Sequence, residues 1–258
     1  HGSCLRNTRA RLSFPVTTGV KRLNKKKNMN NKIDKWLRWL GSCENTGTIA
    51  CELGNLANIR KVQRGLEEMV ANNTALNKPS LFYAVEQAIY SHSVLLYIRR
   101  QVSFHKDSIS LIGLVKDMYE SHSHLSKDYY ANCCANLHSP DERDVWKKFG
   151  EKDFEKFRDP DSDHINPEIL LTLKTSLEQI DKESEPIIDR RLAHLDKRAP
   201  QSVPTYGEIE KWCDQINDIF TKLYLFLTAI HYPMLPDSGQ EWKAIFECPW
   251  INIPTQEP

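Results

Sequence analysis

One stretch of the chain combines side chains that could act on a phosphodiester. It runs from Asp189 to Asp196 and contains Arg190, Arg191 and His194. A guanidinium can bind a phosphate and stabilise the charge that develops on it, while an imidazole titrates near neutral pH and can move a proton. We therefore take His194 as the candidate general acid or base. Arg190 and Arg191 are the candidate catalytic arginines that would hold the phosphate.

A long predicted helix positions this stretch. It begins after Asn166-Pro167, and its apolar stripe consists of Ile169, Leu170, Leu173, Leu177, Ile180, Ile187, Ile188 and Leu192. At ~100° per residue, Arg191 points close to the centre of the stripe and His194 lies on its flank. We expect Pro186 to kink or divide this helix, because proline removes a backbone donor and clashes with the preceding turn.

A purely structural interpretation of the same residues stays open. A guanidinium directed at a core stripe is costly unless it is paired or faces a polar cleft. Arg191 would then pair with a buried carboxylate, and His194 would donate to a carbonyl near the helix end. Basic residues also suit a helix C-terminus, where they meet the negative end of the helix dipole.

The remaining sequence also predicts helices. Only ten glycines occur, and runs of alternating β-branched residues are missing. Apolar residues between 33 and 76 recur at spacings of three and four with an interruption near Gly41 to Gly47, which predicts two helices or one broken helix. A short helix after Lys106-Asp107-Ser108 should be well buried. Thr205 and Glu208 match a capping box at the start of a helix that reaches Ile230 and pairs antiparallel with the preceding one.

Another predicted helix, over residues 81–102, carries polar groups on its apolar face. This face consists of Leu81, Val85, Ala88, His92, Leu95, Arg99 and Val102. The spacing predicts that the face is buried. Arg99 is a candidate binding residue, although a His or an Arg on an apolar face is more often a core residue with an internal partner.

The chain divides into a short basic segment and one domain. Residues 1–28 hold eight basic residues and no acid, and we interpret them as a tag or non-native sequence. Residues 29–258 form a single predicted helical domain. Residues 121–163 are charged and sparsely apolar, and we expect a helical insertion there with four aromatic anchors: Trp146, Phe149, Phe154 and Phe157.

Composition excludes several classes of protein. A 40% hydrophobic and 27% charged chain is neither disordered nor collagen-like, and no apolar run approaches the ~18 residues that a membrane helix needs, so we expect a cytoplasmic protein without a membrane partner. Taking the eight basic residues of the first segment from the total of 35 leaves 27 against 34 acidic residues, a net charge of −7. Any RNA contact must therefore be local.

Sequence motifs give no sign of a cofactor or a metal. Glycine-rich phosphate loops, H-E-x-x-H, G-x-S-x-G and D-x-D-x-D-G are all absent. The seven cysteines include no C-x-x-C pair, so a disulfide framework is not expected. Zinc ligands could come from Cys133 and Cys134 with His122, His124 and His138, but their spacing fits no zinc template, and surface histidines beside buried cysteines are the stronger interpretation.

Three runs of sequence suggest a family. They are Ala84–Ser91 continuing through Leu96–Arg100, Lys106–Leu111, and Arg191–Lys197. Together they resemble the AbiU-type branch of the HEPN superfamily, over roughly residues 36–230. The resemblance implies an all-α fold, a HEPN-like up-and-down four-helix bundle with additional helices, usually as a homodimer in phage abortive infection or toxin-antitoxin systems. It also draws Asp196 and Lys197 into the predicted site as binding residues.

Active members of that superfamily are metal-independent RNases that use an Arg and a His across the dimer. His194 fits the histidine position. In those members roughly four to six residues separate the Arg from the His. The arginine position fits poorly here, because only three residues separate Arg190 from His194. The positions where the family has its arginine hold Asp189, Ile188 and Ile187. Two functions therefore remain open. One is an RNA-binding or RNA-cleaving defence protein with its cleft near His194, and the other is a non-catalytic module that binds a cognate toxin or antitoxin. A small-molecule enzyme with a pocket between helices is a third interpretation without a motif behind it.

Overall fold

The computed structural model describes residues 30–42, 44–74, 76, 80–188, 204–236, 239 and 241–247. Within these ranges the protein is all-α, with eight α-helices, three short 3-10 helices and no strand. The α-helices are α1 (Asn30–Leu40), α2 (Ile49–Ala71), α3 (Leu81–Val102), α4 (Leu111–Glu120), α5 (Lys127–Asn136), α6 (Arg143–Phe154), α7 (Pro167–Ile187) and α8 (Tyr206–Thr228). The 3-10 helices are η1 (His122–His124), η2 (Pro140–Glu142) and η4 (Glu241–Phe246).

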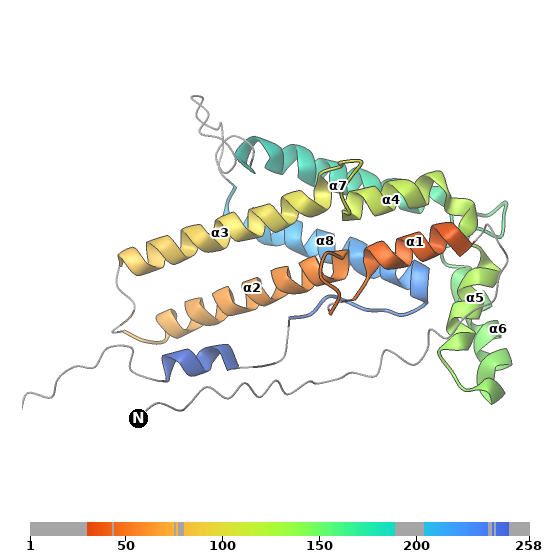
Figure 1. Ribbon diagram of the computed structural model, residues 1–258, viewed down its shortest axis with the longest axis horizontal. Coiled ribbons are helices and arrows are strands. Elements are labelled where there is room, and N and C mark those ends of the chain that lie inside the picture. The colour runs from red at the N-terminus through yellow and green to blue at the C-terminus, as the bar shows by residue number, and fades with distance from the viewer. Residues whose placement is uncertain are drawn as a thin grey trace, which may run out of the picture.

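The long helices lie side by side along the long axis of the molecule (Figure 1). Helix α8 is central, since it contacts α1, α3, α5 and α7. Helix α3 lies between α2 and α7, and α4 continues along α7. Helices α5 and α6 form a hairpin at one end of the molecule. The predicted insertion is therefore helical, and several of its side chains belong to the core: Leu125, Tyr130, Cys134 and Phe154.

Helix ends follow the capping residues of the sequence. Asn166 caps α7, and the Thr205–Glu208 capping box opens α8, which confirms both predictions. The predicted break in the first apolar segment is also confirmed. Helix α1 ends before Gly41, and Gly41 (φ +65°) and Gly47 (φ +77°) both adopt the left-handed conformation that glycine allows without strain.

Two predicted helices need correction in detail. Helix α4 is buried as expected, but it begins at Leu111 with Ser110 as its cap, so the predicted start near Ser108 is wrong. Helix α7 continues through Pro186 to Ile187, and Ile187 and Ile188 are both buried. The proline therefore does not divide the helix within the described residues.

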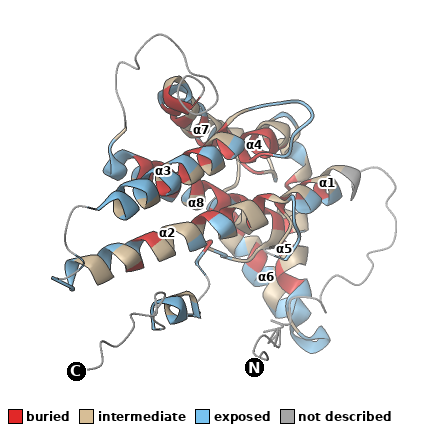
Figure 2. Ribbon diagram, turned by 60° about the vertical axis from the view of Figure 1, so that its left-hand side comes forward, coloured by how far each residue is buried: buried red, intermediate tan, exposed pale blue. Residues whose placement is uncertain are grey.

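The predicted buried face of α3 is wrong for the first half of the helix. Leu81 is 80% exposed, Val85 and His92 are also exposed, and only the later positions Leu95 and Val102 are buried. Helix α8 begins at Tyr206, whose ring stacks on Tyr90 at 6.3 Å between centroids. Residues 81–89 thus extend beyond the start of α8, and the first turns of α3 appear in pale blue in Figure 2. A helix buries a face only where a neighbour covers it.

The α5–α6 hairpin is built on a close helix crossing. A Cβ at Gly150 would lie 2.9 Å from the Cα of Ala131, so only glycine fits at this point. Of the predicted aromatic anchors, Phe154 is buried and Phe157 packs against the core, whereas Phe149 is exposed. None of the described helices has the length and apolar character needed to cross a membrane.

Candidate functional site

The residues that the sequence marks for catalysis lie outside the described part of the chain. These are Arg190, Arg191 and His194, together with the binding candidates Asp196 and Lys197. In the sequence they fall between the end of α7 and the start of α8. Their chemistry therefore stays a prediction.

Arg99 is the one candidate binding residue that the structure describes. Its Nη1 donates to Oδ1 of Asp181 at 2.5 Å, and this ion pair joins α3 to α7. The Arg99 side chain is largely buried beside this carboxylate. Such internal pairing is what the structural interpretation of an Arg on this helix predicts.

The candidate zinc ligands have other surroundings. His122 and His124 each place Nδ1 against a backbone carbonyl, and His138 stacks on Trp146 at 3.7 Å between ring centroids. Cys134 is buried, and burial raises the pKa of both Cys133 and Cys134, which disfavours the thiolate that zinc requires. Across the described residues, no group of three His, Cys, Asp or Glu side chains is arranged to hold a metal ion.

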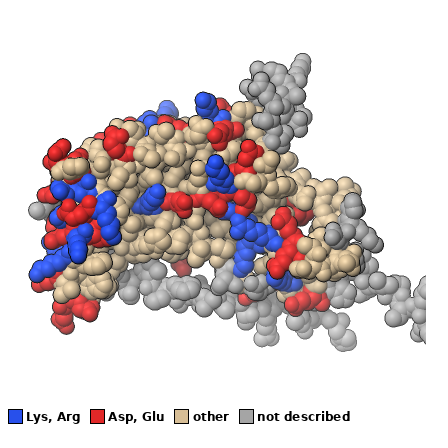
Figure 3. Space-filling model, turned by 180° about the vertical axis from the view of Figure 1, so that it is seen from behind, with Lys and Arg blue, Asp and Glu red and all other residues tan. Residues whose placement is uncertain are grey.

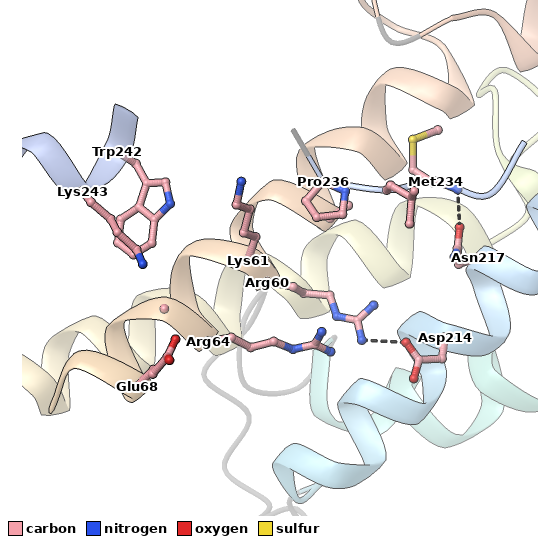
Figure 4. A pocket seen from close by; sticks show the side chains of 13 residues that line it. Arg60, Lys61, Arg64, Glu68, Asp214, Asn217, Met234, Pro236, Trp242 and Lys243 are labelled. Carbon is pink, nitrogen blue, oxygen red and sulfur yellow. Dashed lines mark hydrogen bonds and ion pairs between the residues drawn. The ribbon is translucent and has the colours of Figure 1, made fainter. Parts of the chain in front are cut away.

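A first pocket lies between α2, α8 and the C-terminal segment, by which we mean residues 231–236, 239 and 241–247 (Figure 4). Its volume is about 420 Å³. The charged side chains that line it are Arg60, Lys61, Arg64, Lys243, Glu68 and Asp214. We call this space the basic pocket.

The arginines of the basic pocket are bound by carboxylates of α8. Arg60, whose side chain is only 12% exposed, donates from Nη2 to Glu210 at 2.6 Å and to Asp214 at 2.7 Å. Arg64 pairs with the same Glu210 carboxylate, and the Tyr90 hydroxyl donates to its other oxygen at 2.9 Å. Burial alone would raise the pKa of Glu210, but the three donors stabilise its anion and lower the pKa to about 2.

The C-terminal segment closes the basic pocket. Lys61 donates to the carbonyl of Gly239 at 2.6 Å, and the amide of Met234 donates to Asn217 at 2.9 Å. The Trp242 ring lies so close to α2 that a Cβ at Gly65 would be 2.4 Å from its Cζ2 atom. Since Arg60, Lys61 and Arg64 already have partners inside the protein, the pocket is a joint between α2, α8 and η4 rather than a cradle for an anion.

A second, apolar pocket lies between α2 and α3, on another face of α2. Its volume is about 450 Å³. Its lining comes from Asn58, Ile59, Val62 and Gln63 of α2 and from Phe82, Val85, Glu86, Ile89, Tyr90 and Ser93 of α3. We call this surface the apolar groove. Phe82 is 55% and Ile89 61% exposed, so large apolar side chains of the groove face the solvent.

The exposed apolar side chains continue along α3 on both sides of the groove. From Phe82 onward they are spaced at intervals of three, four and seven, and Leu81 is four residues before Val85, which places all five on one stripe of the helix: Leu81, Phe82, Val85, Ile89 and Leu96. The sequence contained this signal as helical periodicity, but periodicity alone does not tell a core face from an exposed binding face. Whether the stripe is buried depends on where α8 begins relative to α3, and helical periodicity does not show that.

Sequence and structure comparisons bring no relative to this chain. No family model matches it, and no curated protein or solved structure shows significant similarity to it. The described surfaces are therefore the basis for its function.

Proposed function

We propose that this protein is a non-catalytic interaction module and that the apolar groove with the α3 stripe is its binding surface. The observation that carries this proposal is the exposure of Leu81, Phe82, Val85 and Ile89 along one helix beside a concave pocket. Exposed apolar surface of this kind is unfavourable in water, and natural proteins keep it where a partner covers it. An apolar groove between two helices suits a helical segment of that partner.

The charge distribution supports a protein partner over a nucleic acid. The chain after residue 28 carries seven more acidic than basic residues. On the face seen in Figure 3, Lys and Arg lie among Asp and Glu instead of gathering into one basic area. A polyanion would gain little from such a surface.

The resemblance to HEPN proteins of the AbiU type gives this module a biological setting as part of the proposal. We infer a HEPN-like up-and-down four-helix bundle with additional helices, and the long neighbouring helices α2, α3, α7 and α8 support it. The partner would be a cognate toxin or antitoxin. A cytoplasmic location is supported by the free thiols of the described cysteines, because disulfides are rare in that compartment: Cys51, Cys133, Cys134 and Cys213.

Site-specific photocrosslinking tests the interaction module. A photoreactive amino acid is placed at Ile89 in the groove, and a control one at Lys222, which is exposed on α8. We expect irradiation of the native cells to give a discrete adduct from position 89 that position 222 does not give. Phe82→Asp should abolish that adduct, because a buried carboxylate is costly in an apolar contact. Equal adducts from both positions would refute the groove as the binding surface.

RNA cleavage near His194 is the second candidate function. It is supported by helix α7, whose described residues keep the buried stripe past Pro186 to Ile188, as the predicted stripe requires. The test is incubation of the chain with total RNA and purified tRNA in the presence of EDTA, beside His194→Ala and Arg191→Ala. Metal-independent cleavage that is lost in His194→Ala, while the circular dichroism spectrum of the variant is unchanged, would favour the RNase over the interaction module. Cleavage that persists in His194→Ala would remove this histidine from the mechanism.

A further inference from the structure

A buried polar group lies at the floor of the apolar groove. Gln63 is only 3% exposed and lines the groove from α2. Its Nε2 donates to Oε1 of Glu67 at 3.0 Å, while its Oε1 is buried and accepts no hydrogen bond. A buried acceptor without a donor costs free energy, and a donor that enters the groove would recover it.

The groove carries charge of one sign. Among the described residues that line it, Glu86 is the only charged one, and Glu67 lies on the next turn of α2 after Gln63. Burial raises the pKa of Glu86 and the nearby Glu67 carboxylate raises it further, whereas a hydrogen bond from Gln63 opposes both. The two carboxylates thus repel each other across the Gln63 amide, and a cation placed here would relieve that repulsion.

The exposed stripe of α3 sets the length of the occupant. From Leu81 to Leu96 the helix rises by about 22 Å, at ~1.5 Å per residue. An α-helix of about four turns covers that length. Its apolar side chains would lie on the stripe, and its polar flank would lie over Glu86.

We propose that the apolar groove binds an amphipathic α-helix of another protein that carries Lys or Arg beside its apolar face. The basic side chain pairs with Glu86 and Glu67 and directs an N–H toward Oε1 of Gln63. This inference rests on the proposed interaction function and adds the chemistry of the partner. A second copy of this chain fits the groove less well, because a symmetric contact centred here would bring the acidic edges of both copies together.

Two synthetic peptides test the partner chemistry. Both have 18 residues and the same leucine stripe on an alanine background, and the flanking positions hold Lys in one and Glu in the other. Binding to the full chain is measured by fluorescence anisotropy at low salt. We expect the Lys peptide to bind at least about tenfold more tightly than the Glu peptide. In the double variant Glu67→Gln, Glu86→Gln this preference should fall to about twofold or less.

Surface variants locate the binding site. Phe82→Asp should weaken the Lys peptide at least about tenfold, and Val145→Asp should leave it unchanged, because Val145 is exposed on α6 far along the chain from the groove. Lys-peptide binding that Phe82→Asp does not alter would mean attraction to the acidic surface in general and would overturn the inference.

The peptides also separate this inference from the function on which it rests. Equal binding of the Lys and Glu peptides, both lost in Phe82→Asp, would refute the basic partner and leave the interaction surface standing. If neither peptide binds the wild-type chain, the groove is not a helix-binding site and both proposals fail. Circular dichroism of each variant checks that the helices are intact.

Discussion

At the scale of single residues, Glu210 joins three helices of the described chain. Its carboxylate accepts hydrogen bonds from two arginines of α2 and from Tyr90 of α3. Arg60 depends on it, because this guanidinium is mostly buried and its other partner, Asp214, is largely exposed. The cluster fixes the distance of α2 from α8 and, through Tyr90, the position at which α3 leaves the core.

Glu210→Gln should lower the free energy of unfolding by about 2 kcal/mol at pH 7, since the amide leaves the Arg60 charge poorly compensated. This loss of unfolding free energy in Glu210→Gln should depend on pH. The pKa of Glu210 is lowered from 4.5 to about 2 by folding, so its contribution to stability is complete above pH 4.5 and disappears as the pH falls toward 2. Urea unfolding at pH 7, 4 and 2.5 measures this change.

Glu178→Gln is the matched control for the Glu210 prediction. Glu178 pairs with Lys174 at 2.8 Å one turn away on the exposed side of α7. Its replacement should cost less than about 0.5 kcal/mol at every pH. A Glu210→Gln deficit that stays constant from pH 7 to 2.5 would contradict the assigned role of the carboxylate.

At the scale of elements, the packing of η4 against α2 depends on a glycine in α2. Gly65 lies in the middle of the helix, where glycine is unfavourable, and it leaves room for the Trp242 ring. Gly65→Ala should displace the ring and release η4 from α2. The α-helical core should keep its stability or gain up to about 1 kcal/mol, because alanine favours the helix.

Fluorescence measures the release of η4. The contribution of Trp242 is the difference between spectra with Trp and with Phe at position 242, and Gly65→Ala should shift this difference to longer wavelength. Gly207→Ala is the control, because the nearest atom to its Cβ would be at an ordinary contact distance of 3.9 Å. An unshifted Trp242 contribution in Gly65→Ala would show that the contact is not formed.

Several element boundaries were predictable from the sequence because they are set locally, although the start of α4 was not. The capping residues Asn166 and Thr205 and the glycine at position 41 act within one turn of the helix end. The burial of a helix face is not local. The first half of α3 has the periodicity of a core helix, yet it is exposed because α8 begins level with Tyr90. The sequence thus revealed the stripe but not which environment it meets.

At the scale of the whole molecule, the all-α class followed from helical spacing and the lack of alternating segments, and the structure confirms it for the described residues. The two pockets were not predictable. The basic pocket combines residues from helices that are far apart in sequence, as Arg60 and Asp214 are, 154 positions apart. The apolar groove lies between the consecutive helices α2 and α3, but its exposure depends on where α8 begins. The predicted site at Arg190, Arg191 and His194 is a local motif, which is why sequence could propose it, and it stays a prediction.

The central position of α8 also sets an order of events during synthesis. It is the last of the described α-helices to be made, yet α1, α3, α5 and α7 all pack against it. A ribosome that adds roughly 5–20 residues per second needs about 8–30 s to cover the 150 residues from Arg60 to Glu210. During that interval the earlier helices lack their common neighbour. The nascent chain therefore carries uncovered apolar surface until α8 emerges, and it is in that period that it most needs a chaperone.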